Sequence, residues 1–120
     1  MSIHATYTLT NQCMIVEASG INESAEQLFA FVREMNAQAE AANVYKVLCD
    51  ERNLDYKVSI LLLLELGKET ATLTEFLKKV AIVIQPRYME DRKFFENVVR
   101  NHGGQILVTT DYAEAERWLQ

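Results

Sequence analysis

The residues of this chain whose types and spacing could do chemistry stand close together: Asp50, Arg52 and Ser59. We predict a buried strand over residues 45–50 and a helix that begins near Val58 or Ser59, so these side chains follow a strand end and precede a helix. Ligands and partners of open α/β sheets collect at such strand ends. A carboxylate, a guanidinium and a hydroxyl there suit binding, whereas the stretch lacks the groups that an enzyme would need.

Asp50 and Arg52 are two residues apart, so they point to the same side if the backbone stays extended. One interpretation is a salt bridge, or a carboxylate bonded to nearby backbone N–H groups, that fixes a loop. The other is that Arg52 receives an anionic head group at the mouth of a pocket. The sequence leaves both open.

Ser59 is expected to cap the helix that it begins, which typically stabilises a helix by about 1 kcal/mol. The alternative is a phosphorylation site, because a phosphate there would gain from the helix dipole. The apolar run that follows, residues 60–66, includes Ile60 and Leu63. It belongs either to the core or, on one side, to an apolar cleft or a dimer contact.

Several enzyme classes lack their motifs in this sequence. There is no Gly-x-Gly-x-x-Gly for a dinucleotide, no Gly-rich loop ending in Lys-Ser/Thr, and no Gly-x-Ser-x-Gly elbow. His4 and His102 stand far apart and no Cys-x-x-Cys exists, so we predict no metal site and no cofactor. Cys13 and Cys49 are expected to be free thiols inside strands, and no histidine near Cys49 in sequence would activate it. We name no catalytic residue.

Composition is that of an ordinary globular protein, and we predict a single domain over residues 1–120. Apolar residues make up 49% of the chain and charged residues 24%. The start does not resemble a signal peptide, and the longest apolar run is too short for a transmembrane segment, so a cytoplasmic protein is expected.

Charge is uneven along the chain, whose net charge is −5. Residues 78–100 hold six basic residues, Arg92 among them, against three acidic ones. This segment is either a normally solvated helix face or a shallow patch that attracts anions. The overall acidity argues against nucleic acid as a partner.

The order of apolar patterns predicts ββαβαβαβα. The capping signals are Ser24 with Gln27, and Asp111 with Glu114. Asn43 is expected to end the first helix, and residues 101–104 the third. The predicted strands span residues 5–10, 13–18, 45–50, 79–85 and 105–108, and the second helix runs from Val58 or Ser59 to about Thr70.

Strands that alternate with helices favour a mostly parallel five-stranded sheet with four helices and right-handed crossovers. The first strand is expected to lie antiparallel at one edge. If most helices lie on one face, apolar strand residues on the other face need cover from a second subunit or a ligand. We therefore expect a homodimer.

Four stretches give the chain a resemblance to the STAS domain and, more closely, to SpoIIAA-like bacterial proteins. The resemblance implies this α/β fold and a regulatory interaction module. It also implies, for anti-sigma-factor antagonists, a kinase-like partner and a switch by phosphorylation, and some relatives are thought to bind apolar ligands. The stretches are residues 46–54, 79–83, 101–108 and 113–119.

The switch motif of these relatives, Asp-Ser-Ser/Thr-Gly, is altered here. Val58 stands in place of the aspartate, Ile60 in place of the second hydroxyl and Leu61 in place of the glycine. Ser59 alone keeps a hydroxyl, at the first serine position. The departure argues against a phospho-switch.

Three functions follow from these observations. The first is a non-enzymatic STAS/SpoIIAA-like regulatory or protein-interaction module, which binds a kinase-like or sigma-factor-linked partner through residues 50–60 and the adjacent helix. The alternative is a small carrier of an apolar or amphipathic, lipid-like ligand in a cleft beside the second helix, with Arg52 at the polar end. The third is a hydrolase or transferase with an unrecognised site. A cavity of a few hundred Å³ would favour the carrier, and a filled core the interaction module.

Overall fold

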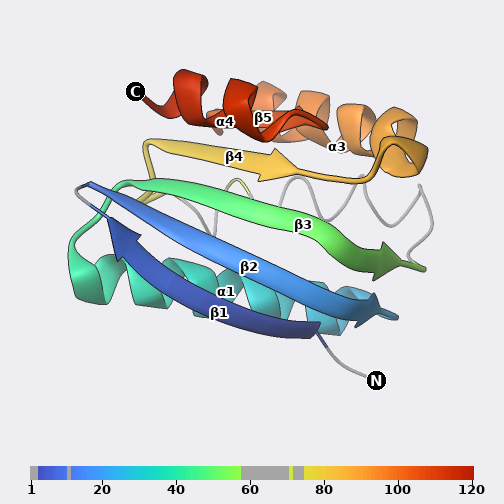
Figure 1. The fold of residues 1–120 in the computed structure, drawn as a ribbon, viewed down its shortest axis with the longest axis horizontal. Coiled ribbons are helices and arrows are strands. Elements are labelled where there is room, and N and C mark those ends of the chain that lie inside the picture. The colour runs from blue at the N-terminus through green and yellow to red at the C-terminus, as the bar shows by residue number, and fades with distance from the viewer. Residues whose placement is uncertain (1–2, 11, 58–70, 72–74) are drawn as a thin grey trace.

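The computed structural model describes residues 3–10, 12–57, 71 and 75–120, and these residues form one five-stranded sheet flanked by helices (Figure 1). The strands are β1 (Ile3–Thr10), β2 (Cys13–Asn22), β3 (Lys46–Tyr56), β4 (Lys79–Val83) and β5 (Ile106–Thr109), and the described helices are α1 (Ala25–Ala42), α3 (Met89–Asn101) and α4 (Tyr112–Leu119), with the 3₁₀ turn η1 (Pro86–Tyr88).

The sheet order is β1-β2-β3-β4-β5. β1 pairs antiparallel with β2 at one edge, and the other three strand pairs are parallel. The predicted mixed sheet and its strand order along the chain are therefore confirmed. The second predicted helix, over residues 58–70, lies outside the described residues.

Short-range hydrogen bonds set the ends of the helices. Ser24 Oγ accepts a hydrogen bond from the Gln27 backbone N–H at 3.2 Å, and Asp111 Oδ1 accepts from the N–H groups of Ala113 and Glu114. Asn43 ends α1 in the left-handed conformation, with φ of 57°. These caps confirm the ends expected from the sequence, because each depends on residues only a few positions apart.

Helices cover both faces of the sheet. Along β3, Val47 and Cys49 pack in one hydrophobic cluster with side chains of α1 and α3, and Leu48 packs in a second cluster with Ala115 and Leu119 of α4. Alternate residues of a strand point to opposite faces. A strand buried on both faces must be apolar throughout, which explains the continuous apolar runs of β3 and β4.

The argument for a dimer is weakened by this arrangement. α4 packs against β3, β4 and β5. The uncovered part of that face carries Thr6, Thr8 and Glu17, which are polar and exposed. Their sequence neighbours Tyr7 and Val16 point to the opposite face and pack in the core. Water can cover such a surface, so the homodimer stays a prediction without its original reason.

β3 is longer than the sequence predicts. It continues past Asp50 to Tyr56, because β2 also continues to Asn22 and the two strands pair along their length. The register between β2 and β3 shifts between Glu17 and Ser19, and regular parallel pairing continues after this irregularity. Asp50 and Arg52 therefore lie within a strand, and the prediction that they leave its end was wrong.

The outer edge of β5 is covered by side chains of α3. The Glu96 carboxylate accepts a hydrogen bond from the Val108 backbone N–H, and Arg100 Nε donates to the Ile106 carbonyl oxygen at 2.8 Å. Unpaired strand edges are prone to pairing with other chains. α3 thus satisfies this edge with its own side chains.

Candidate functional site

Asp50 and Arg52 form the salt bridge that was one of the two interpretations of this pair. Arg52 Nε donates to Asp50 Oδ1 at 2.9 Å, and Arg52 Nη2 donates to Asp50 Oδ2 at 2.8 Å. The side chain of Arg52 is 49% exposed. Hydrogen bonding from this guanidinium lowers the pKa of Asp50 below its ordinary value. The bidentate geometry fixes the guanidinium while leaving much of it in solvent.

Tyr112, the first residue of α4, holds the guanidinium from a second element. The Arg52 Cζ atom lies 5.1 Å from the centre of the Tyr112 ring, which is cation–π distance. We call Asp50, Arg52 and Tyr112 the Arg52 platform. It lies on the α4 face of the sheet, with a cation and an aromatic ring side by side.

The remaining predicted site residues, Ser59, Ile60 and Leu63, lie outside the described residues. Cys49 is buried and its Sγ donates to Glu51 Oε2 at 3.1 Å. Burial raises the pKa of Cys49 well above its ordinary value, so the thiol stays protonated near neutral pH. Cys13 and Cys49 are both free, as expected.

A second polar cluster lies at the carboxyl end of β3. Asp55 accepts hydrogen bonds from Gln85 Nε2 at 3.4 Å and from the Tyr88 hydroxyl at 3.3 Å, and it forms an ion pair with Arg87. Arg87 is 61% exposed. The sequence analysis did not single out Asp55, because its partners Gln85, Arg87 and Tyr88 lie some 30 residues away in sequence.

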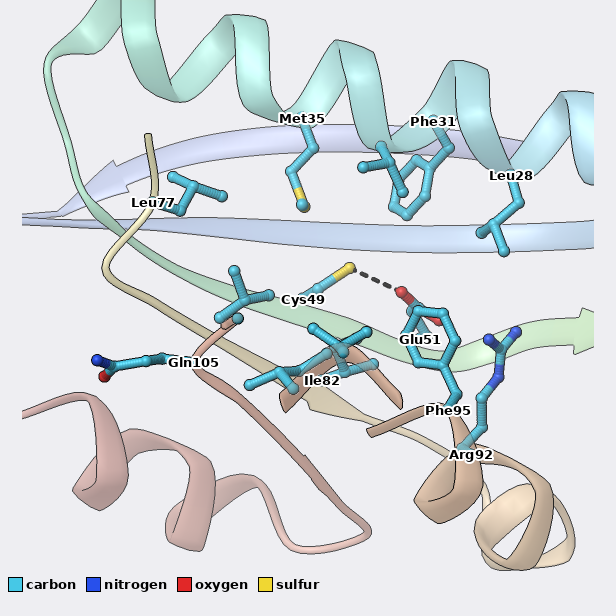
Figure 2. Close-up of a pocket in the computed structure, with 15 residues that line it drawn as sticks. Leu28, Phe31, Met35, Cys49, Glu51, Leu77, Ile82, Arg92, Phe95 and Gln105 are labelled. Carbon is cyan, nitrogen blue, oxygen red and sulfur yellow. Dashed lines mark hydrogen bonds between the residues drawn. The ribbon is translucent and has the colours of Figure 1, made fainter. Parts of the chain in front are cut away.

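Between α1, α3 and the sheet lies a cavity of about 50 Å³ that the sequence did not reveal (Figure 2). It lies on the face of β3 opposite the Arg52 platform. Such a volume is far below the few hundred Å³ that a lipid-sized ligand occupies. The described residues around it are Leu28, Phe31, Val32, Met35, Cys49, Glu51, Leu77, Val80, Ile82, Arg92, Phe95, Val99, Gly104, Gln105 and Ile106.

Charged groups in the wall of this cavity are buried. Glu51 is 5% exposed, and its two oxygens accept hydrogen bonds from Cys49 Sγ and from the Tyr56 hydroxyl. Burial and the charge of Glu51 raise the pKa of Tyr56 well above its ordinary value. Arg92 is also 5% exposed, so it belongs neither to a solvated helix face nor to a surface patch. The sequence prediction for Arg92 was therefore wrong.

Metal binding and membrane insertion find no support in the part of the chain that the structure describes. Over that part, no three His, Cys, Asp or Glu side chains gather in a way that could hold a metal ion. No described helix is both long and apolar enough to span a bilayer.

Comparison with known proteins shows the fold. No protein-family model matches the chain, and no curated protein matches it. An anti-sigma factor antagonist from Mycobacterium paratuberculosis matches with a TM-score of 0.65 at 12% identity, covering 98% of this chain and 94% of that one. The fold is SpoIIAA-like. An uncharacterised DUF3478 protein of SpoIIAA-like fold from Shewanella loihica matches with a TM-score of 0.57 at 20% identity, covering 99% and 94%.

This likeness confirms the fold that the four sequence stretches imply. Identities of 12% and 20% are too low to transfer an activity, because one fold can carry many unrelated functions. Function must therefore be argued from the site.

Proposed function

We propose that residues 1–120 form a single, non-enzymatic regulatory module of the STAS type, which works in the cytoplasm by binding a partner protein. The near full-length likeness to an anti-sigma factor antagonist supports this class. By that analogy the partner is an anti-sigma factor, or a kinase-like or other sigma-factor-linked regulator. We further propose that Ser59, Ile60 and Leu63 extend the binding surface.

The Arg52 platform is the observation that carries the proposal. Its guanidinium is held by Asp50 and stacked near Tyr112 before any partner arrives. Ordering a long side chain at an interface costs free energy, and a side chain that is already ordered avoids much of that cost. Arginine and tyrosine are also the residue types most enriched in the energetic centres of interfaces.

The guanidinium retains hydrogen-bonding capacity for a partner. Arginine has five N–H donors, and Asp50 accepts from Nε and Nη2. The remaining donors can bind a carboxylate or carbonyl oxygen of the partner. An acidic loop docked on α4 and β3 fits this geometry.

The buried polar groups support a non-enzymatic role. The buried Glu51 carboxylate accepts hydrogen bonds from the buried Cys49 thiol and from the hydroxyl of the partly buried Tyr56. A general acid or base must reach its substrate. Groups that are buried and mutually satisfied favour a structural or binding role over catalysis.

The test is calorimetric titration of the purified protein with the anti-sigma factors and related kinase-like proteins of its source organism. We expect Arg52→Ala and Tyr112→Ala each to weaken binding about tenfold or more, which is about 1.4 kcal/mol. The matched control is Arg33→Ala, because Arg33 is an exposed arginine on α1, on the other face of the sheet.

Two outcomes would separate the parts of the proposal. If none of these regulators binds, the functional class is wrong. If a regulator binds and Arg52→Ala binds it as tightly as Arg33→Ala does, the class stands but the Arg52 platform is not the surface.

A further inference from the structure

Arg92 is a buried cation, 5% exposed, with an unpartnered nitrogen in its guanidinium. Its Nη2 atom is enclosed and has no hydrogen-bond partner. No ion pair joins it to any residue that the structure describes. A charge removed from water is unfavourable unless an opposite charge or hydrogen bonds replace the lost hydration. The Nη2 group therefore needs an acceptor that the described side chains do not provide.

The neighbouring aromatic rings do not supply that acceptor. The Arg92 Cζ atom lies 3.8 Å from the centre of the Tyr56 ring and 5.5 Å from that of Phe95. Stacking stabilises the flat face of a guanidinium, but its N–H donors lie in the plane of the group and point past the rings. The two rings thus hold Arg92 in place and leave its Nη2 group without an acceptor.

Glu51, the carboxylate in the same cavity wall, forms its hydrogen bonds with residues other than Arg92. Its oxygens accept from Cys49 Sγ and the Tyr56 hydroxyl. Figure 2 shows Arg92 and Glu51 beside the same apolar space, with Arg92 reaching in from α3. The cavity thus combines apolar walls with one cation whose Nη2 group lacks an acceptor.

We propose that this cavity binds a small carboxylate with a short apolar tail, and that Arg92 is its counter-ion. A carboxylate matches the paired donors of a guanidinium better than any neutral acceptor does. The cavity volume is about 50 Å³, which accommodates roughly three or four water-sized groups. The ligand class is therefore a short monocarboxylate of about the size of acetate, and propionate and butyrate test how much longer a tail the cavity accommodates. This site is independent of the Arg52 platform, which lies on the other face of the sheet.

The proposal also predicts that substitutions at Glu51 and at Arg92 change carboxylate binding in opposite directions. A bound carboxylate lies in the same cavity as the Glu51 carboxylate, and like charges repel. Glu51→Gln removes that repulsion and keeps one acceptor oxygen, which can accept from the Tyr56 hydroxyl or from Cys49 Sγ but not from both in the present geometry. Carboxylate binding should therefore tighten in Glu51→Gln and weaken in Arg92→Met.

The experiment is a two-dimensional NMR titration of the full chain with sodium acetate, propionate and butyrate at constant ionic strength, beside propionamide as the neutral analogue. We expect saturable shifts of cavity-wall amides with propionate, and at least tenfold weaker binding of propionamide. Arg92→Met should weaken propionate binding at least tenfold, Glu51→Gln should strengthen it, and Arg33→Met, at an exposed arginine of α1, should leave it unchanged.

Thermal unfolding without ligand serves as the folding control. Arg92→Met removes an unpaired buried charge and should unfold at the same or a higher temperature than the wild type. Absence of saturable shifts in the wild-type protein for all three acids would overturn the proposal. Equal binding of propionate by Arg92→Met and wild type, or of propionamide and propionate by the wild type, would overturn the role of Arg92.

Discussion

At the scale of single residues, the charged groups of this molecule differ in their exposure to solvent. Asp50 and Arg52 form a bidentate pair that is partly exposed, whereas Glu51 and Arg92 are buried. An exposed pair adds little to stability, because water screens it. Under the proposed function, the exposed pair orients a guanidinium for a partner, whereas the buried groups line the cavity.

The pKa of Asp50 gives a pH prediction at this scale. Hydrogen bonds from Arg52 lower the pKa of the folded state below the ordinary value of 3.8, so the pair stabilises the protein above that pH. Its contribution is lost as pH falls through the lowered pKa. Since the Arg52 side chain is half exposed, we expect only about 0.5–1 kcal/mol.

Urea unfolding of the wild type and Asp50→Asn at pH 7 and near pH 3 measures this contribution. The wild type should be more stable than the variant at pH 7, and the difference should shrink at the lower pH. A difference that grows on acidification would show that the pair does not stabilise the folded state.

At the scale of elements, α3 contributes an edge cover for β5 as well as core side chains. The buried Glu96 carboxylate accepts from the Val108 backbone N–H and from Lys93 Nζ. Glu96→Ala leaves that strand N–H without a protein acceptor. We expect a loss of about 1–3 kcal/mol from the free energy of unfolding.

Glu96→Gln is the matched variant, because its amide oxygen can still accept from Val108. It should lose less stability than Glu96→Ala, and amide hydrogen exchange at Val108 should follow the same order. Equal losses in the two variants would mean that the edge hydrogen bond contributes little.

Element boundaries were predictable where their causes are local. The caps at Ser24, Asn43 and Asp111 each depend on a few neighbouring residues, and all three were predicted. The true end of β3 was not predictable, because the polar residues after Asp50 have low strand propensity. They are extended because they pair with the end of β2, which is distant in sequence.

At the scale of the whole molecule, the order of apolar and polar segments was enough to predict a five-stranded sheet with one antiparallel edge strand. The cavity was not predictable. Glu51 and Arg92 line the same cavity because α3 packs on the same face as alternate residues of β3. Glu and Arg are usually exposed, so the sequence does not indicate that Glu51 and Arg92 are buried.

The oligomeric state of the whole molecule can be tested. The sequence predicts a homodimer, but the polar side chains on the uncovered part of the α4 face do not require a second subunit to cover them. Light scattering at high micromolar concentration measures the mass directly. A mass of two chains would confirm the dimer, and a mass of one chain, 13.8 kDa, would contradict it.

The most direct test of the central claim is hydrogen exchange of the protein alone and with a cognate anti-sigma factor or kinase-like regulator. Binding through the Arg52 platform should slow exchange in β3 around residues 50–52 and at the start of α4, and Arg52→Ala should abolish that protection. Protection confined to α1 and β1, or exchange unchanged by every such regulator, would contradict the account.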